Sequence, residues 1–220
     1  MLVNDIEQAR RNMVLQQIRP WDVLDERVLR VIQEVPREAF VPDAYRGLAF
    51  ADIEVPLGHG QAMMPPRVEA RMLQALNVHR GERVLEIGTG SGYVSACLAR
   101  LGGEVTSLDI HAEFTTAAQK RFEANGIKGV ELRTADAFAV DFGITRFDAI
   151  AVTGSLPQCQ NRFEQLLTVG GRLFLICGQA PAMEAMLVTR VSDSAWRRDP
   201  LFETVVAPLE NAPQPEQFHF

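Results

Sequence analysis

The sequence contains few cysteines, and its histidines lack the spacing of a metal site. Cys97, Cys159 and Cys177 are odd in number, far apart and free of any Cys-x-x-Cys motif. Each falls in or near an expected core element, so we expect buried thiols rather than a disulfide. No His-x-x-x-His pattern is present, so we expect no metal, and a single histidine near a turn, such as His111, is more often a surface residue than a catalytic one. The four histidines are His59, His79, His111 and His219.

Long basic runs and long apolar runs are also absent from the 220 residues. The formal net charge of −6 disfavours nucleic acid and anionic membranes as partners. No apolar run approaches the ~20 residues that span a bilayer, and Asn4, Asp5 and Glu7 interrupt any signal peptide. We therefore expect a soluble cytoplasmic protein, consisting of one large domain or of a domain with an extension.

The most informative segment is 84–92, which reads Val-Leu-Glu-Ile-Gly-Thr-Gly-Ser-Gly. An apolar strand runs into alternating glycines and then into a helical pattern. Glycines at a strand-to-helix turn allow a sharp bend and let a ligand lie against the main chain. A second strand ends at Asp109, where a carboxylate can accept hydrogen bonds from two ribose hydroxyls. Together these features predict a nucleoside-binding βαβ unit.

The spacing of the glycines separates two kinds of nucleoside site. A dinucleotide site needs Gly-x-Gly-x-x-Gly, but the last position is Tyr93 when counted from Gly88 and Ser95 when counted from Gly90. The observed form, Glu-x-Gly-x-Gly-x-Gly, resembles motif I of S-adenosylmethionine-dependent methyltransferases.

The first eighty residues are predicted to be helices and loops. Apolar residues at helical spacing predict a helix over 5–19, which Pro20 ends. Asp25 suits the N-cap of a short helix, and residues 51–60 are expected to be extended or loop-like. Pro66 suits the first turn of a helix that reaches residue 76.

From residue 83 strands and helices alternate, which predicts a mostly parallel sheet with helices on both faces. The segments 184–191 and 196–206 predict an antiparallel hairpin at the sheet edge. We expect an α/β, Rossmann-like methyltransferase fold with an N-terminal helical extension, 1–80, packed on a core, 81–220. The prolines of the tail, 208–220, oppose regular structure, and its aromatic end can dock on the body. The expected strands are 83–87, 104–108, 129–133, 146–152 and 171–177, and the expected helices are 92–101, 112–125 and 160–168.

Over nearly its whole length the chain resembles the protein-L-isoaspartate O-methyltransferase family. Two of the matching segments, 35–42 and 56–61, lie in the N-terminal extension that generic methyltransferases lack, and they are therefore more specific than motif I. The segments that carry the resemblance are 17–20, 35–42, 56–61, 84–93, 147–153 and 170–173.

The resemblance implies S-adenosyl-L-methionine as cofactor and isoaspartyl-containing proteins or peptides as substrates. By it the turn from Gly88 to Gly92 would hold the methionine part, Asp109 the ribose, and Asp136 with Ala137 the adenine. The loop 61–64 would close over the cofactor near the transferable methyl. The cofactor-binding candidates are Gln61, Met63, Met64, Glu86, Gly88, Thr89, Gly90, Asp109, Ile110, Asp136 and Ala137.

The sequence departs from the family in that loop. The family continues Gly-x-Gly-Gln-Thr-Ile-Ser-x-Pro, whereas here Ala62 replaces the threonine and Met64 the serine. A hydroxyl can donate to a substrate carboxylate and a thioether cannot, and loss of one placed donor can cost about 10²–10³ in rate. Either the loop backbone suffices for isoaspartyl methylation, or that activity is weakened. No catalytic residue is assigned, since the family serine position is Met64.

Three functions remain open. The first is methylation of isoaspartyl carboxylates in damaged proteins, which needs no general base because a carboxylate is ionised at pH 7. The second is a diverged methyltransferase with another acceptor, selected by the apolar Met63 and Met64; an alcohol or amine would need a base, for which His59 and Asp52 are candidates. The third is a cofactor-binding protein without repair activity.

Overall fold

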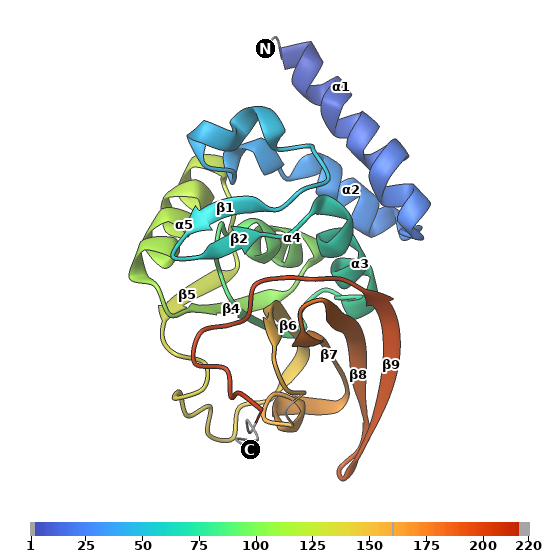
Figure 1. The fold of residues 1–220 in the computed structure, drawn as a ribbon, viewed down its shortest axis with the longest axis vertical. Coiled ribbons are helices and arrows are strands. Elements are labelled where there is room, and N and C mark those ends of the chain that lie inside the picture. Colours follow the sequence, from blue (N-terminus) through green and yellow to red (C-terminus); the bar gives the residue numbers. More distant parts are fainter. Residues whose placement is uncertain (1–2, 160, 216–220) are drawn as a thin grey trace.

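The strands expected after residue 83 pair into one seven-stranded sheet in the computed structural model, which describes residues 3–159 and 161–215 (Figure 1). The order is β5-β4-β3-β6-β7-β8-β9; the first five strands are parallel, and β8 and β9 add antiparallel at the edge. This confirms the Rossmann-like fold class. The bounds are β3 Arg83–Ile87, β4 Glu104–Asp109, β5 Val130–Thr134, β6 Phe147–Leu156, β7 Leu167–Gln179, β8 Ala182–Ser192 and β9 Ala195–Glu203.

In the described part of the chain, the α-helices begin within two residues of the predicted positions. Asp25 caps α2, its side chain accepting a hydrogen bond from the Arg27 backbone N–H, and Pro66 opens α3. The predicted helix 5–19 is α1 continued by a π-helical turn, Val14–Ile18, and a 3₁₀ turn, Arg19–Trp21. The α-helices are α1 Val3–Met13, α2 Glu26–Glu34, α3 Pro66–Leu76, α4 Tyr93–Leu101 and α5 Ala112–Asn125; further 3₁₀ turns span Arg37–Ala39, Asp43–Leu48 and Glu164–Leu166.

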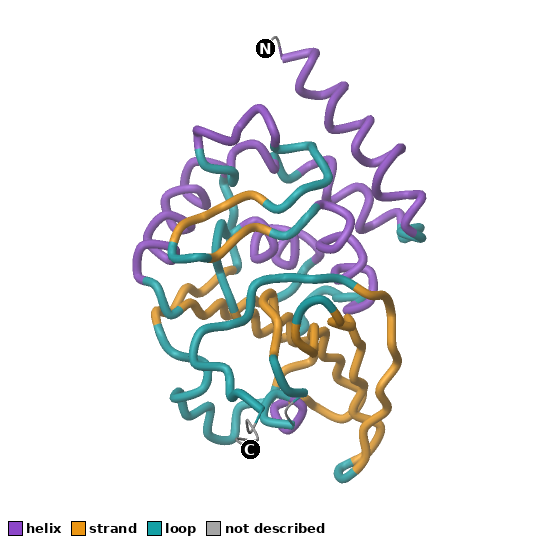
Figure 2. The backbone as a smooth tube through the Cα atoms, in the orientation of Figure 1, coloured by secondary structure: helices purple, strands orange, loops and turns teal. Residues whose placement is uncertain are grey.

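The two faces of the sheet are covered differently, which corrects the expectation of helices on both. One apolar cluster packs α2 to α5 against one face, whereas the other face is covered mainly by loops (Figure 2). The predicted helix 160–168 is wrong: where it is described, the segment holds only the 3₁₀ turn Glu164–Leu166 before β7 begins at Leu167. The three apolar residues of this segment, Phe163, Leu166 and Leu167, are too few to distinguish a helix from a turn that leads into a strand.

A disulfide joins Cys159 to Cys177, which corrects the expectation of thiols at both positions. The strand register explains it, because Leu156 at the end of β6 lies opposite Cys177 on β7. The chain after β6 therefore stays beside that strand end, and the two cysteine Cα atoms are 5.4 Å apart. Cys97 is a free, buried thiol, as predicted.

A small hairpin and the C-terminal tail close over the ends of the strands. The hairpin consists of β1 Val55–Gly58 and β2 Gln61–Met63 and crosses near α4 and α5 (Figure 1). The tail runs beside β6, where Ser155 accepts a hydrogen bond from the Leu209 backbone N–H. The predicted docking of the aromatic end, 217–220, falls outside the described residues.

The N-terminal extension shares one apolar cluster with the sheet. The same cluster includes α4, where the Tyr93 ring meets the Phe40 ring of the extension edge to face, with centroids 5.7 Å apart. The boundary at residue 80 stays a prediction. Within the described ranges, no helix has the length and apolar character needed to cross a membrane.

Arg172 ties the end of α3 to the sheet. Its guanidinium donates to the carbonyl oxygens of Leu76, at 2.6 and 2.9 Å, and Asn77, at 2.8 Å. It also donates to the Glu82 carboxylate and to the Asp148 carbonyl. These bonds occupy carbonyls that the helix end leaves without intrahelical partners.

We expect Arg172→Leu to lower the free energy of unfolding by about 2–3 kcal/mol, because it leaves these acceptors unpaired. Urea denaturation measures the change. Arg133→Leu is the matched control, since Arg133 makes an exposed ion pair with Glu131 that contributes little. Equal losses in both variants would contradict this role for Arg172.

Candidate active site

A pocket opens at the carboxyl ends of β3, β4 and β6, where the order of the strands reverses. Open parallel sheets bind ligands at this switch point. All eleven residues predicted to bind cofactor line the pocket, and they come from the hairpin, from the ends of β3 and β4 and from the loop after β5. They are Gln61, Met63, Met64, Glu86, Gly88, Thr89, Gly90, Asp109, Ile110, Asp136 and Ala137.

The glycine turn after β3 forms the floor of the pocket. Gly88, Gly90 and Gly92 have φ values of +98°, +50° and +84°, which non-glycine residues rarely adopt. A Cβ on Gly90 would lie 3.1 Å from the Leu57 side chain of the hairpin. The bare main chain therefore keeps open the space between the turn and the hairpin.

Asp109 ends β4 and holds the glycine turn in place. One carboxylate oxygen accepts from the Gly90 backbone N–H at 2.8 Å, and the other accepts from the His111 backbone N–H at 3.0 Å. Burial raises the pKa of Asp109, and these two hydrogen bonds oppose that rise. Each oxygen retains a lone pair for a further donor in the pocket.

Glu86 lies at the centre of a fully buried polar network. One of its oxygens accepts hydrogen bonds from the hydroxyls of Ser95 and Ser107, and the other, Oε1, is buried with no partner among the described residues. Burial raises the pKa of Glu86 from 4.5 to about 8, a rise that the two hydroxyls oppose and the nearby Asp109 reinforces. The unpaired oxygen belongs to a pocket-lining residue, so it suits a donor on a ligand.

Asp136 and Ala137 contribute to the pocket from the loop after β5, against the C-terminal tail. Asp136 accepts from the Phe138 backbone N–H and from the Asn211 side-chain amide, both at 2.8 Å. Leu209 of the tail also lines the pocket. The tail lies beside β6 in space but is distant from it in sequence. The approach of Leu209 and Asn211 to Asp136 is therefore visible only in the structure.

Met64 follows the hairpin, and a buried arginine holds its backbone in place. The Arg37 guanidinium donates to the Met64 carbonyl oxygen at 2.8 Å and forms an ion pair with Glu69 of α3. It also donates to the Ala49 carbonyl oxygen and lies over the Tyr93 ring at 4.9 Å. Arg37 and Glu69 are 1% and 2% exposed, so this ion pair fixes the backbone of the loop that reaches the pocket.

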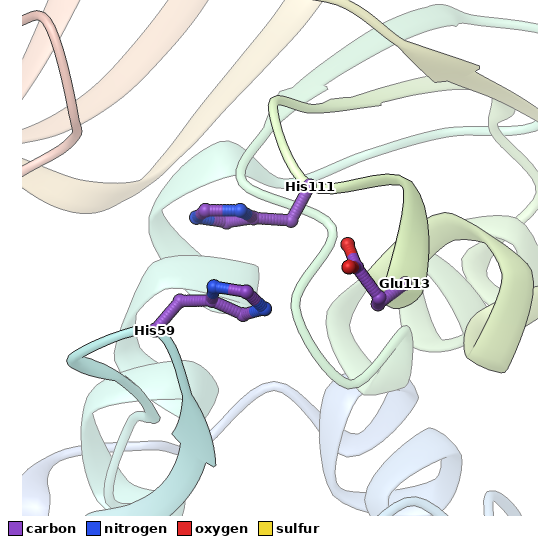
Figure 3. Close-up of side chains that lie close together, drawn as sticks. All are labelled: His59, His111 and Glu113. Atoms are coloured by element: carbon purple, nitrogen blue, oxygen red, sulfur yellow. The ribbon is translucent and has the colours of Figure 1, made fainter.

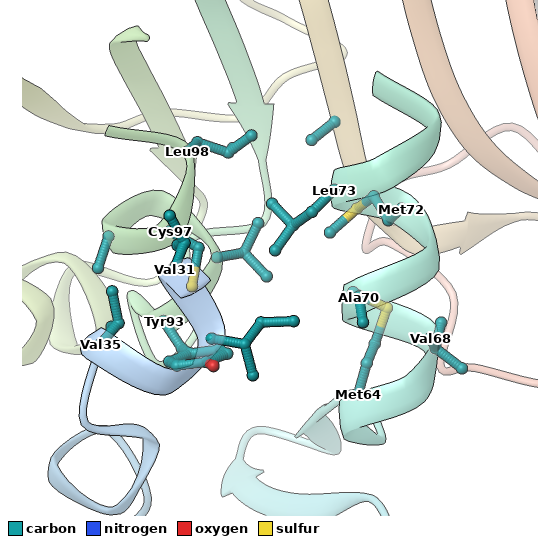
Figure 4. Close-up of a cluster of buried hydrophobic side chains, with 14 of the residues drawn as sticks. Val31, Val35, Met64, Val68, Ala70, Met72, Leu73, Tyr93, Cys97 and Leu98 are labelled. Atoms are coloured by element: carbon teal, nitrogen blue, oxygen red, sulfur yellow. The ribbon is translucent and has the colours of Figure 1, made fainter. Parts of the chain in front are cut away.

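The Met64 side chain belongs to the apolar cluster between α3 and α4 (Figure 4). Both Met63 and Met64 are 4% exposed, and both line the pocket. Two thioethers therefore lie where the family has a hydroxyl and an aliphatic side chain. The nearby Gln61 amide makes no hydrogen bond within the described residues and is a donor that the loop retains.

Three other polar residues considered in the sequence, His59, His111 and Asp52, lie differently with respect to the pocket. His111, which we expected at the surface, is the N-cap residue of α5, lines the pocket and bonds to Glu210 through Nε2 at 2.6 Å. His59 is exposed on the hairpin turn and stacks on His111. Asp52 forms an ion pair with Arg67 and does not line the pocket, so it is poorly placed to act as a base.

Sequence reasoning missed residues of three kinds. Thr153 lies within β6 and donates to the Gly88 carbonyl oxygen at 2.6 Å. It directly follows the strand predicted over 146–152, and this position is a signal in the sequence that could have identified it. Leu57 and Phe114 reach the pocket from the hairpin and from α5, and Leu209 and Glu210 reach it from the tail. No local pattern marks these last residues, because their position depends on the packing of distant segments.

The pocket fits S-adenosyl-L-methionine, the cofactor that the resemblance implies. A side chain on Gly90 would fill the space between turn and hairpin, Glu86 presents an unpaired buried oxygen, and Asp109 has free lone pairs at a strand end. Hydrogen-bond donors on the ligand complement the free oxygen of Glu86 and the lone pairs of Asp109.

We expect Asp109→Asn to weaken binding of S-adenosyl-L-homocysteine by about 1–3 kcal/mol, because the amide loses the charge and one acceptor. Isothermal titration calorimetry measures the affinity. Glu131→Gln on the exposed β5 is the control and should bind as the unsubstituted protein does. Unchanged affinity in Asp109→Asn would exclude Asp109 as the ribose acid.

The raised pKa of Glu86 predicts a pH-dependent stability. Between the ordinary pKa of 4.5 and about 8, the folded protein keeps a proton that the unfolded chain loses. The free energy of unfolding therefore falls as pH rises across this window, by up to about 1.4 kcal/mol per pH unit from this group. Glu86→Gln should lack this loss when urea denaturation without cofactor is followed from pH 5 to 9. Parallel pH profiles for the two proteins would refute the assignment.

Comparison with known proteins agrees with this geometry. Residues 8–213 match the family model described as protein-L-isoaspartate(D-aspartate) O-methyltransferase (PCMT). Protein-L-isoaspartate O-methyltransferase 1 of Rhodopseudomonas palustris strain HaA2 is 37% identical over 91% of this chain and 82% of its own length. Protein-L-isoaspartate O-methyltransferase 2 of Marinobacter nauticus is 37% identical over 93% of this chain and 94% of its own length.

Among solved structures, a Plasmodium falciparum protein described as a protein-L-isoaspartate O-methyltransferase in complex with S-adenosyl-L-homocysteine has a TM-score of 0.80. It covers 93% of this chain and 97% of its own, at 18% identity, which shows a shared fold. The match over almost the whole chain and the two close relatives lead to one conclusion: this chain belongs to the protein-L-isoaspartate O-methyltransferase family.

Proposed function

We propose that this protein transfers a methyl group from S-adenosyl-L-methionine to the free carboxylate of isoaspartyl residues in damaged proteins or peptides. The observation that carries the proposal is that three of the family-matching segments, 56–61, 84–93 and 147–153, which are far apart in sequence, contribute to the lining of one pocket at the switch point of the sheet. When bound, the cofactor supplies an electrophilic methyl group on sulfur. The expected cytoplasmic location stays a prediction.

Different residues of the pocket would bind different parts of the cofactor. The glycine turn and Glu86 would hold the methionine part, because they offer bare main chain and an unpaired buried oxygen. Asp109 would bind the ribose hydroxyls, and Asp136 with Ala137 would lie against the adenine. The family resemblance implies these roles, and the presence of each residue in the pocket lining supports them.

The reaction requires alignment more than acid–base chemistry. A carboxylate acceptor has an ordinary pKa near 4 and is already ionised at pH 7, so no general base is needed. The protein must orient the nucleophile and exclude water. Leu57 on the hairpin and Leu209 on the tail line the pocket from two sides and give it an apolar cover.

The loop lacks two hydroxyls that would help to fix the acceptor. With Ala62 and Met64 in those positions, the side-chain donor left on the loop is the Gln61 amide. We therefore expect isoaspartyl methylation that is detectable but slower than that of a relative with both hydroxyls. The backbone of the loop stays fixed, because Arg37 binds the Met64 carbonyl oxygen.

One observation favours a second candidate function. Met63 and Met64 make part of the pocket lining apolar. An acceptor with an apolar body beside its carboxylate would fit this lining better than a polar peptide does. The second candidate is thus a methyltransferase of the same chemistry with a small apolar carboxylic acid as acceptor.

Restoring the hydroxyls tests the proposal. Ala62→Thr combined with Met64→Ser should raise kcat/KM for an isoaspartyl peptide by at least about tenfold, because the donors fix the attack geometry. Met64 is buried, so its replacement also costs about 2–4 kcal/mol of stability. Ala62→Thr combined with Met64→Ala is the matched control, since it loses the same packing without gaining the serine hydroxyl.

Equal rates for these two double variants would show that a hydroxyl at position 64 is irrelevant here. If neither variant nor the original protein methylates the peptide while all bind S-adenosyl-L-homocysteine, isoaspartyl methylation is excluded and the second candidate replaces it.

A further inference from the structure

Two histidines and a carboxylate meet at the rim of the pocket (Figure 3). His59 lies on the turn between β1 and β2, His111 precedes α5, and Glu113 lies in the first turn of α5. One ligand atom from each of the three side chains lies within 4.8 Å of the other two. The expectation of no metal rested on spacing in the sequence, whereas the fold brings together residues that no sequence pattern connects.

The hydrogen bond to Glu210 prepares His111 as a ligand. A carboxylate only accepts, so the Nε2–H of His111 donates a hydrogen bond to Glu210 at 2.6 Å. In the tautomer with the proton on Nε2, the lone pair of the ring lies on Nδ1. Histidines that bind metals commonly donate their other N–H to a carboxylate in this way, which fixes the ring and raises its basicity.

The ligand set selects the kind of ion. Two imidazole nitrogens and one carboxylate oxygen suit zinc and similar borderline divalent ions, with a fourth position left for water. The two carboxylates, Glu113 on one side and Glu210 behind His111, balance a charge of +2. Magnesium and calcium, which take oxygen ligands, fit this set poorly.

A shared ion requires a small rearrangement. Zinc–nitrogen bonds of about 2.0–2.1 Å place two nitrogens on one tetrahedral ion about 3.4 Å apart. The His59 and His111 rings are stacked with centroids 4.0 Å apart and planes at 20°, so one ring must turn to direct its lone pair at the ion. His59 is the ring free to do so: it is exposed on a tight turn, and its ring makes no hydrogen bond in the described part of the chain.

We propose that His59, His111 and Glu113 form a zinc site that fastens the β1–β2 hairpin to α5 over the cofactor pocket. The hairpin carries Leu57 and Gln61, and His111 itself lines the pocket. An ion at this position therefore binds the state in which the hairpin covers the cofactor. Zinc and cofactor then tighten each other's binding by the same factor, as linkage requires.

The test is a titration of the full chain with Zn²⁺, with and without S-adenosyl-L-homocysteine, and it does not depend on methyl transfer. The expected result is one saturable ion per chain. His59→Ala and His111→Ala should each weaken binding by at least about tenfold, and Glu113→Gln should weaken it less. The protein with bound S-adenosyl-L-homocysteine should bind zinc at least about fivefold more tightly than the protein without it.

His79→Ala is the matched control, because His79 is an exposed histidine whose backbone N–H, not its ring, makes its hydrogen bond to Glu82. It should bind zinc as the unsubstituted protein does. Absence of saturable binding, or equal affinity in His59→Ala and the unsubstituted protein, would overturn the site. Zinc affinity that S-adenosyl-L-homocysteine leaves unchanged would overturn the coupling to the cofactor.

Discussion

The buried ion pair between Arg37 and Glu69 is the contact on which the site depends. The guanidinium reaches the backbone at Ala49 and Met64 and lies against Tyr93 of α4, so one side chain connects the N-terminal extension, the hairpin loop and two helices. Removing either partner would leave a charge in the apolar interior, which costs several kcal/mol. The need to keep this pair intact explains why the extension is part of the site and not an appendage to it.

Because Arg37 binds the backbone, the position of the loop does not depend on the side chain at position 64. Arg37 binds the Met64 carbonyl oxygen whatever the side chain at position 64, so a methionine can replace a serine without moving the loop. The replacement changes the chemistry of the pocket wall from a hydroxyl donor to a thioether, and packing in the apolar cluster stabilises it. The loop thus keeps its place over the cofactor and loses a polar contact to the acceptor.

The features that the sequence predicted correctly are those that depend on residues close together in the chain. The glycines from Gly88 to Gly92 and the acid at Asp109 identified the turn and its strands, and Asp25 and Pro66 marked two helix starts, because each acts through its own backbone. The Cys159–Cys177 disulfide was missed, since the register of β6 against β7 brings the two residues together. The approach of His59 to His111 and the arrival of Leu209 at the pocket were missed for the same reason: they depend on how distant segments pack.

The most direct measurement compares methyl transfer to two peptides of one sequence, one with an isoaspartyl residue and one with an aspartyl residue. Labelled S-adenosyl-L-methionine and the unsubstituted protein are sufficient. Our account predicts labelling of the isoaspartyl peptide, in a base-labile ester, and none of the aspartyl peptide. Equal labelling of both, or no labelling of the isoaspartyl peptide by protein that binds the cofactor, would contradict it.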